Sequence, residues 1–317
     1  MNGENPDADG FAAEVCWHYY VNELTQAEIA KMLGVTRLRV NQAIQRARAS
    51  GMVRIEIEAE HLPQLDLQDR LLKRYGLKRV EVAPSRPGSD DYHKPTGAAL
   101  ASLISSRLRA GGWQRIGVSW GMTLKAAIDR MPLHDLPRVE VISMIGGTNR
   151  GEKFNAFGIA SGLAERLSAR YSLLPAPIFL APQVDRAAFL SQSIFTEHLD
   201  KLTRLDAAIL TCSDISERSY LIRTGLPKGM DAGELIAAGA IGDVVGRFLD
   251  NEGQVVATTL DDCTIGIELA VLRTVPERIL AAAGRHKVAI IRAVLRAGFA
   301  NVLVTDDATA ELLLDAQ

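Results

Sequence analysis

A dense group of amide and guanidinium side chains lies between residues 36 and 46. Arginine can bind guanine through two parallel hydrogen bonds, and asparagine or glutamine can bind adenine in the same way. Further cations beside such a group can bind the phosphates that dominate the affinity of proteins for DNA. From Thr25 to Arg54 the chain has six Lys or Arg residues and one acid, although its formal net charge is -2. These residue types predict a surface that reads duplex DNA, formed by Lys31, Thr36, Arg37, Arg39, Asn41, Gln42 and Arg46.

The pattern from Leu24 to Val40 predicts the two short helices and tight turn of a helix-turn-helix. Thr25 and Glu28 have the spacing of a capping box, in which each side chain binds the backbone N–H of the other residue. Gly34 is then expected to end the first helix. The alternative is an ordinary helical hairpin with a solvated basic face. The order of cap, turn and following strand favours the DNA-reading motif.

The second helix of this motif is expected to begin after Thr36, which can cap it. Leu38 and Ile44 are expected to pack inward, so that the amide and guanidinium groups face outward into a DNA groove. After this helix, residues 52–57 alternate between apolar and polar side chains, as a strand does. This strand predicts a small wing, so residues 1–58 are expected to form a winged helix-turn-helix domain.

Glycine turns and isolated polar residues follow several apolar runs in the rest of the chain. Backbone amides in a glycine turn that opens a helix can bind an anionic or hydroxylated ligand, as can a hydroxyl beside them. A carboxylate among apolar neighbours can accept hydrogen bonds from sugar hydroxyls, and a cation at a helix start can bind a phosphate or carboxylate. Ordinary turns, a turn cap and a solvated lysine are the alternatives. The residues with these features are Gly121, Met122, Thr123, Gly146, Gly147, Asp243 and Lys287.

Short β-branched runs alternate with helical segments from Lys78 onward, which is typical of an α/β domain with a mainly parallel sheet. In such sheets ligands bind beyond the carboxyl ends of the strands, and several of the polar residues above follow predicted strands. The predicted strands are residues 79–83, 115–119, 139–143, 207–211, 243–249, 278–283 and 301–305. The predicted helices include residues 97–109, 155–169 and 287–297.

A leucine-rich helix is predicted between the two parts of the chain, over residues 62–76, with Gly76 as its C-terminal stop. Its apolar stripe can pack on the large domain or on a second subunit, and the sequence favours neither. The expected domain division is therefore a DNA-binding domain at residues 1–58, a linker helix at 59–76 and a large α/β domain at 77–317.

Composition restricts the class of protein. The chain has 317 residues with 47% hydrophobic content, which is enough for one small domain and one large core. No apolar run approaches the roughly 20 residues that span a bilayer, and residues 1–10 are polar, so we expect a cytoplasmic protein. The three cysteines and six histidines are widely spaced, so we expect no metal site and no cofactor.

Four motifs of the large domain occur in a recognisable order, at residues 117–124, 242–246, 287–290 and 303–306. Together with residues 24–57, they resemble the SorC/DeoR-type sugar-binding transcriptional regulators over nearly the whole chain. The resemblance implies an effector domain related in fold to sugar-phosphate isomerases, which also forms the oligomer of a repressor or activator. It implies operator DNA as one partner and a small sugar, polyol or sugar phosphate as effector. It further implies no catalysis, and it adds Arg223 to the pocket residues.

Three positions depart from the residues usual in this family. Met122 stands where the family often has a polar or cationic residue, so both free and phosphorylated ligands remain open. Asn41 and Gln42 replace the family's common Ser-Arg pair, which predicts an operator unlike the usual one.

The alternative function is a sugar-phosphate isomerase-like enzyme that carries a DNA-binding module. Such an enzyme needs a general base near the substrate, for which Asp243 or the pair Asp261 and Asp262 is available. No partner acid, nucleophile–base pair or metal set accompanies them in the sequence. A nucleotide-sensing regulator would need a fuller phosphate loop. A lysine Schiff base at Lys125 or Lys153 is a further alternative, although the sequence shows no sign of a lowered lysine pKa.

Overall fold

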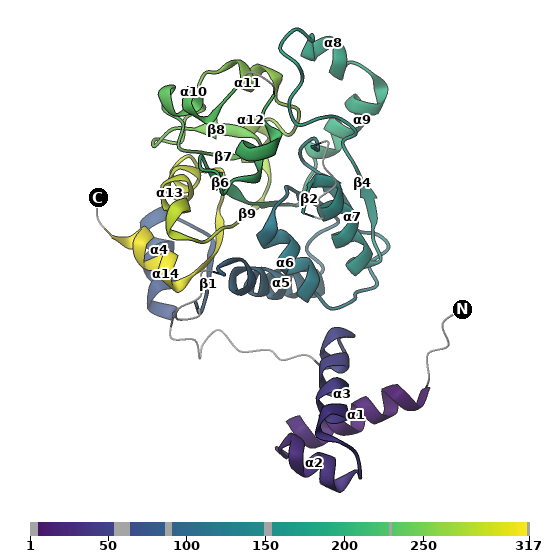
Figure 1. Cartoon of the computed structure of the whole chain (residues 1–317). Coiled ribbons are helices and arrows are strands. Elements are labelled where there is room, and N and C mark those ends of the chain that lie inside the picture. Colours follow the sequence, from purple (N-terminus) through teal and green to yellow (C-terminus); the bar gives the residue numbers. More distant parts are fainter. Residues whose placement is uncertain (1–5, 54–63, 86–90, 149–153, 228–229, 316–317) are drawn as a thin grey trace. The chain divides into compact units, whose positions relative to one another are not determined.

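The chain divides into two compact parts, which we call unit 1 (Met1–His61) and unit 2 (Leu62–Gln317) (Figure 1). Each unit has its own hydrophobic core. No helix among the described residues is long and apolar enough to cross a membrane. The computed structural model describes the whole chain except residues 1–5, 54–63, 86–90, 149–153, 228–229 and 316–317.

Unit 1, as far as the structure describes it, packs three helices around a small core: α1 (Pro6–Tyr20), α2 (Gln26–Met32) and α3 (Arg37–Ala49). The predicted capping box of α2 is confirmed, because Thr25 accepts from the Glu28 N–H and the Glu28 carboxylate accepts from the Thr25 N–H. Gly34 has a φ of 64°, a left-handed conformation that suits glycine and turns the chain between α2 and α3. The helix-turn-helix prediction is therefore confirmed.

The inward packing of Leu38 is a wrong prediction. Its side chain is 65% exposed, and Val40 is fully buried instead. Val40, Ile44 and Ala47 lie three or four residues apart and so form one face, which packs on α1. The helix α1 itself was not predicted, although its apolar residues recur at helical spacing. Of the predicted wing strand, only residues 52 and 53 are described, as a bend, and the rest lies outside the described residues.

In the described part of unit 2, seven strands form one parallel sheet in the order β1-β10-β9-β5-β2-β3-β4. The mainly parallel sheet is therefore confirmed. Six of the predicted strands are found here with their ends shifted by no more than two residues. The strands are β1 (Arg79–Ala83), β2 (Arg115–Val118), β3 (Glu140–Ser143), β4 (Arg170–Ser172), β5 (Ala207–Leu210), β9 (Glu277–Ala281) and β10 (Val302–Asp306).

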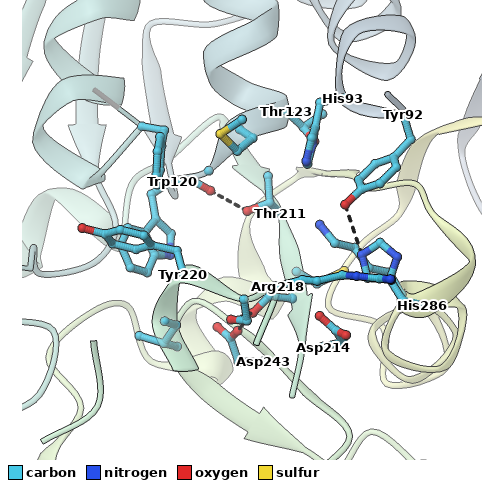
Figure 2. A pocket seen from close by; sticks show the side chains of 18 of the residues that line it. Tyr92, His93, Trp120, Thr123, Thr211, Asp214, Arg218, Tyr220, Asp243 and His286 are labelled. Atoms are coloured by element: carbon cyan, nitrogen blue, oxygen red, sulfur yellow. Dashed lines mark hydrogen bonds between the residues drawn. The ribbon is translucent and has the colours of Figure 1, made fainter. Parts of the chain in front are cut away.

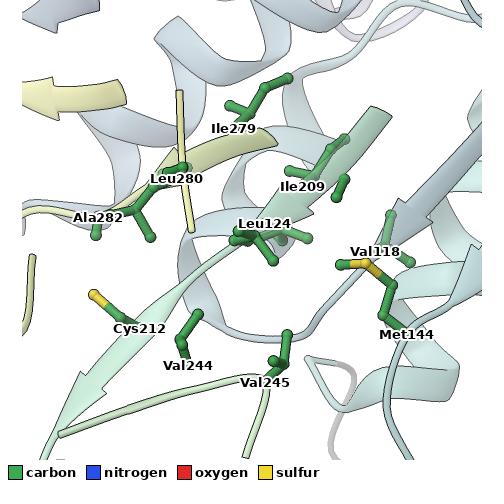
Figure 3. Packing of buried hydrophobic residues seen from close by; sticks show 14 of the residues in the cluster. Val118, Leu124, Met144, Ile209, Cys212, Val244, Val245, Ile279, Leu280 and Ala282 are labelled. Atoms are coloured by element: carbon green, nitrogen blue, oxygen red, sulfur yellow. The ribbon is translucent and has the colours of Figure 1, made fainter. Parts of the chain in front are cut away.

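Helices follow most of these strands, and the three predicted helices correspond to α5, α7 and α13. The buried faces of strands and helices meet in a continuous core, where Leu124 of α6 lies among residues of β2, β5 and β9 (Figure 3). The helices are α4 (Leu65–Tyr75), α5 (His93–Arg109), α6 (Met122–Arg130), α7 (Ala156–Leu167), α8 (Arg186–Leu190), α9 (Ser193–Leu202), α10 (Ala232–Ala237), α11 (Thr259–Cys263), α12 (Leu269–Thr274), α13 (Val288–Arg296) and α14 (Asp307–Leu314), with a π-helical turn η2 (Leu221–Gly225) and a 3-10 turn η3 (Arg285–Lys287).

A second, antiparallel sheet contains β6 (Cys212–Asp214), β7 (Gly242–Val244) and β8 (Arg247–Leu249). The prediction of one strand over residues 243–249 is therefore wrong, because the chain reverses at Val245 and Gly246. Both residues have positive φ angles, 47° and 78°, as a tight two-residue hairpin requires.

The predicted linker helix is α4, and it packs within unit 2. Leu71 is fully buried in the core of unit 2, and the Tyr75 hydroxyl donates a hydrogen bond of 3.1 Å to the Leu313 carbonyl on α14. Gly76 ends the helix in the left-handed conformation, as predicted. Of the two packing partners that the sequence left open, the large domain receives this apolar stripe.

Replacing Leu71 with alanine is expected to lower the free energy of unfolding by about 2–5 kcal/mol, since it leaves a cavity in a fully buried site. Leu65 lies on the same helix but is 41% exposed, so Leu65→Ala is expected to cost less than about 0.5 kcal/mol. Urea-induced unfolding of the full chain, followed by circular dichroism, measures both. Equal effects of the two substitutions would contradict the packing of α4 on unit 2.

Candidate functional site

A cavity of about 330 Å³ lies at the carboxyl ends of β2 and β5. These two strands are neighbours, yet from β2 the chain continues through β3 to β4 on one side, whereas from β5 it continues to β9 and β10 on the other. The crevice at such a change of direction is where parallel α/β sheets bind their ligands. Trp120 and Gly121, which follow β2, and Thr211, which follows β5, line the cavity (Figure 2).

Most of the residues predicted for a pocket do line this cavity, although they come from distant parts of the chain. The residues in this group are Gly121, Met122, Thr123, Arg223, Asp243 and Lys287.

Gly146 and Gly147 are not among the described lining residues, so the structure does not support their predicted place in the pocket. Their amides donate to the carbonyls of Ile265 and Ala176. A Cβ added to Gly146 would lie 2.5 Å from the Pro177 carbonyl oxygen, and one added to Gly147 would lie 2.9 Å from a ring carbon of Phe157. These glycines allow close packing of chain segments, a role that also requires glycine.

The N-terminus of α6 faces the cavity. The Gly121 N–H donates to the Phe154 carbonyl at 2.9 Å. Contrary to the expectation from the sequence, this N–H is therefore not available to a ligand. The amides of Met122 and Thr123 belong to the first turn of α6 and have no acceptor within the helix. The buried Thr123 hydroxyl lies 2.9 Å from Nδ1 of His93.

The carboxylate of Asp243 lies on the opposite wall and is almost fully buried, with 4% exposure. It accepts hydrogen bonds from the Ser213 hydroxyl and from the Gly246 N–H, the latter at 3.1 Å. Burial raises the pKa of Asp243 to about 6, although these hydrogen bonds and the Lys287 charge act in the opposite direction. At neutral pH the carboxylate is therefore ionised and can accept hydrogen bonds from ligand hydroxyls.

Lys287 and two histidines form a third wall. The Lys287 ammonium lies 5.6 Å from the centre of the Tyr92 ring, and Nε2 of His286 lies 3.2 Å from the Tyr92 hydroxyl. Burial lowers the pKa of His93 to about 4 and also lowers the pKa of His286. Both imidazoles are thus neutral at pH 7.

Aromatic rings close one end of the cavity. Tyr220 meets Trp120 edge to face at 5.6 Å between ring centres, and Phe154 at 4.9 Å. Such rings offer apolar surface to the C–H groups of a ligand whose hydroxyls point to polar side chains.

Sequence reasoning missed much of this lining. Thr211 ends a predicted strand and His286 precedes Lys287, so position alone could have suggested both. Tyr92 caps α5 and His93 begins it. Neither residue gave such a signal, because only the tertiary fold brings them to the strand ends. The missed lining residues are Tyr92, His93, Trp120, Phe154, Thr211, Cys212, Ser213, Asp214, Arg218, Ser219, Tyr220, Leu221 and His286.

The side chains predicted to bind DNA lie on α3 and at the end of α2. Asn41 is half-buried, and the Thr36 hydroxyl accepts the Arg39 N–H at 3.2 Å, so it caps the helix. Two arginines of α3 contact aromatic residues of α1: Arg39 lies 4.9 Å from the Phe11 ring centre, and Arg48 donates to the Tyr20 hydroxyl at 2.7 Å. The exposed members of the predicted set are Lys31, Thr36, Arg37, Arg39, Gln42 and Arg46.

Two of the residues considered for catalysis or for a Schiff base have structural partners. Asp261 forms an ion pair with the buried Arg247, and Lys125 pairs with Asp129 one turn along α6. Lys153 lies outside the described residues. Within the described ranges, no group of three or more His, Cys, Asp or Glu side chains is placed to hold a metal ion.

Comparison with known proteins matches each of the two units to a known protein family. Residues 60–315 match the sugar-binding domain family Sugar-bind, and residues 15–50 match sigma-70 region 4. The erythritol catabolism regulatory protein EryD of Brucella abortus is 30% identical over 307 residues, which are 96% of this chain and 96% of that protein. The crystal structure of the full-length sorbitol operon regulator SorC from Klebsiella pneumoniae superposes with a TM-score of 0.77, at 27% identity, over 99% of this chain and 100% of that one.

The chain belongs to the SorC/DeoR-type family of sugar-binding transcriptional regulators. These relatives are regulators, so the comparisons support the function of a DNA-binding regulator over that of an isomerase-like enzyme. As a member of the SorC/DeoR-type family, the chain combines a helix-turn-helix with an α/β sugar-binding domain.

Replacing Asp243 with asparagine is expected to remove one pH-dependent contribution to stability. The pKa of Asp243 is raised from 3.8 to about 6 in the folded state, so the folded state binds this proton more tightly than the unfolded chain. The free energy of unfolding therefore falls by about 2–3 kcal/mol as the pH rises from about 4 to about 6, and the variant lacks this fall.

His93 contributes to the pH dependence of the free energy of unfolding with the opposite sign, because its lowered pKa makes the folded state lose stability as the pH falls toward 4. This contribution is common to both proteins and cancels in their difference. Urea unfolding of wild type and variant between about pH 4 and 7.5 measures that difference. A difference in the free energy of unfolding that stays constant with pH would contradict the raised pKa of the buried Asp243.

Proposed function

We propose that the cavity binds the effector, a small sugar, polyol or sugar phosphate, and that Asp243 and Lys287 recognise its two ends. The observation that carries this proposal is that a buried carboxylate and a lysine ammonium line one cavity beside the first-turn amides of α6. A volume of about 330 Å³ is at the lower end of the range for small-molecule sites, which suits a ligand of monosaccharide size.

Each wall has a chemical role in this proposal. Asp243 accepts hydrogen bonds from hydroxyls, and the rings of Trp120 and Tyr220 pack against C–H groups. Lys287 and the amides of Met122 and Thr123 bind a phosphate when the ligand has one, and hydroxyls when it has none. EryD and the sorbitol operon regulator are named for acyclic polyols, which supports the inclusion of polyols.

The proposed mechanism couples this pocket to α3 through an oligomer. A single helix-turn-helix binds too weakly to find a genomic site, so we propose that two or more chains bind one operator. Effector binding favours one arrangement of the subunits and thereby changes the spacing of two α3 helices relative to successive major grooves. The wing, the domain division at residues 58 and 76, and the pocket residues named above are parts of this proposal.

Replacing Asp243 with asparagine is expected to weaken effector binding about 10- to 100-fold, because a charged hydrogen-bond acceptor for hydroxyls is lost. A thermal-shift screen of free sugars, polyols and their phosphates on the full chain identifies the ligand, whose binding raises the unfolding midpoint. Asp135→Asn is the matched control, since Asp135 is exposed and does not line the cavity. Equal shifts in the two variants, or none with any compound in the wild type, would refute the proposed pocket.

Replacing Arg46 with alanine is expected to weaken operator binding and to reduce the slope of log affinity against log salt by about 1, since one phosphate contact is lost. Arg130→Ala removes an exposed arginine from α6 of unit 2 and is expected to leave both quantities unchanged. Fluorescence anisotropy with selected operator DNA at several salt concentrations measures affinity and stoichiometry. Identical slopes for the two variants, or one chain per operator, would contradict the mechanism.

A further inference from the structure

The exposed side chain of Leu38 needs a physical explanation. It is 65% exposed at the second position of α3, immediately after Thr36 and Arg37 at the helix start. The apolar contacts of α3 with α1 and α2 are made by other residues, including Val40 and Ile44. Leu38 therefore contributes nothing to the core of unit 1.

Leu38 begins the row of side chains that points away from this core. Gln42 lies one turn further along the helix and Gln45 three residues beyond that, so the three side chains share one face. All three are exposed, and none carries a charge. The outward face of α3 thus has a neutral centre with one apolar group at its N-terminal end.

Cations border this neutral row on both sides. Arg39 and Arg46 lie seven residues apart and border one side, and Arg37 and Arg48 border the other. All four arginines are exposed. This pattern fits a helix in a major groove, where the centre of the helix faces base edges and its borders face phosphates. A second copy of the same positive surface would be repelled, so charge favours DNA as the occupant.

We propose that Leu38 determines sequence specificity by contacting the 5-methyl group of a thymine in the operator. The proposal rests on the placement of α3 in the major groove. The early residues of a recognition helix reach base edges, and the apolar group that a base edge offers there is the thymine methyl. A leucine makes no hydrogen bond, so at a guanine or cytosine it covers polar atoms without compensation. Gln42, on the same face, can bind an adenine of the same or a neighbouring pair.

The test compares thymine with deoxyuridine, which lacks only the methyl group. The full wild-type chain selects its binding sites from random duplex DNA, and each thymine of the selected site is then replaced by deoxyuridine. At one or two thymines per half-site the wild type is expected to bind about 3- to 5-fold more weakly, the loss that follows from one buried methyl group. Leu38→Ala is expected to bind the two DNAs equally at those positions.

Two further variants make this comparison specific. Leu133→Ala removes an equally apolar side chain that is 58% exposed in unit 2, and it is expected to keep the wild-type pattern. Leu38→Met retains an apolar group of similar size and is expected to keep the preference for thymine. Alanine and methionine both suit a helix, so the variants are expected to fold, which circular dichroism checks.

The outcomes separate this inference from the proposed function. If the wild type enriches no sequence, DNA reading by α3 fails. If it enriches a site but no thymine is sensitive to loss of its methyl group, or Leu38→Ala shows the same sensitivity as the wild type, the role of Leu38 is overturned and the DNA-reading function remains.

Discussion

The burial of the Asp243 carboxylate is the constraint on which the cavity at the strand ends depends. A carboxylate removed from water must find donors, and here they are the Ser213 hydroxyl on β6 and the Gly246 N–H in the β7–β8 turn. These two bonds hold the small sheet together at the point where it faces the strand ends of the large one. The turn places the β-branched Val245 at a φ of 47°, a strained conformation that its own burial maintains. Strain of this kind is typical of residues beside a binding site.

The charged side chains that line the cavity bear on the class of ligand that it can hold: two are acids, Asp214 and Asp243, and three are bases, Arg218, Arg223 and Lys287. Asp243 is ionised at neutral pH, and the two half-buried histidines, His93 and His286, remain neutral. Opposite charges that lie in one small space partly cancel each other's electrostatic potential, so a ligand that is itself neutral is accepted without a large penalty. An anionic ligand gains from Lys287 only if its charge is held away from Asp243. In the proposed effector site, a phosphorylated ligand is therefore oriented more strictly than a free polyol.

The elements that the sequence predicted correctly are those set by local patterns. Buried parallel strands such as β5 and β10 appear as apolar runs, and the cap at Thr25 and the turn at Gly34 have strong local signals. Errors arose where tertiary packing decides between local possibilities. The hairpin depends on hydrogen bonding to Asp243, which no spacing rule reveals. Leu38 and Val40 lie on opposite faces of α3, and the packing of the Val40 face on α1 decides which of the two is buried. Glycine at residue 146 reflects close packing of the chain, which the sequence does not distinguish from close approach of a ligand.

The contacts between α1 and two arginines of α3 have a thermodynamic consequence. Arg39 rests against the Phe11 ring, and Arg48 is hydrogen-bonded to Tyr20. A free arginine side chain loses about 2 kcal/mol of rotamer entropy when it is fixed, and these two are partly ordered before any nucleic acid arrives. In the proposed complex with operator DNA, the association of these arginines with phosphates requires less ordering than it would on an isolated helix. There the aromatic residues of α1 influence how tightly the operator is held, although they act on it only through the arginines that they restrain.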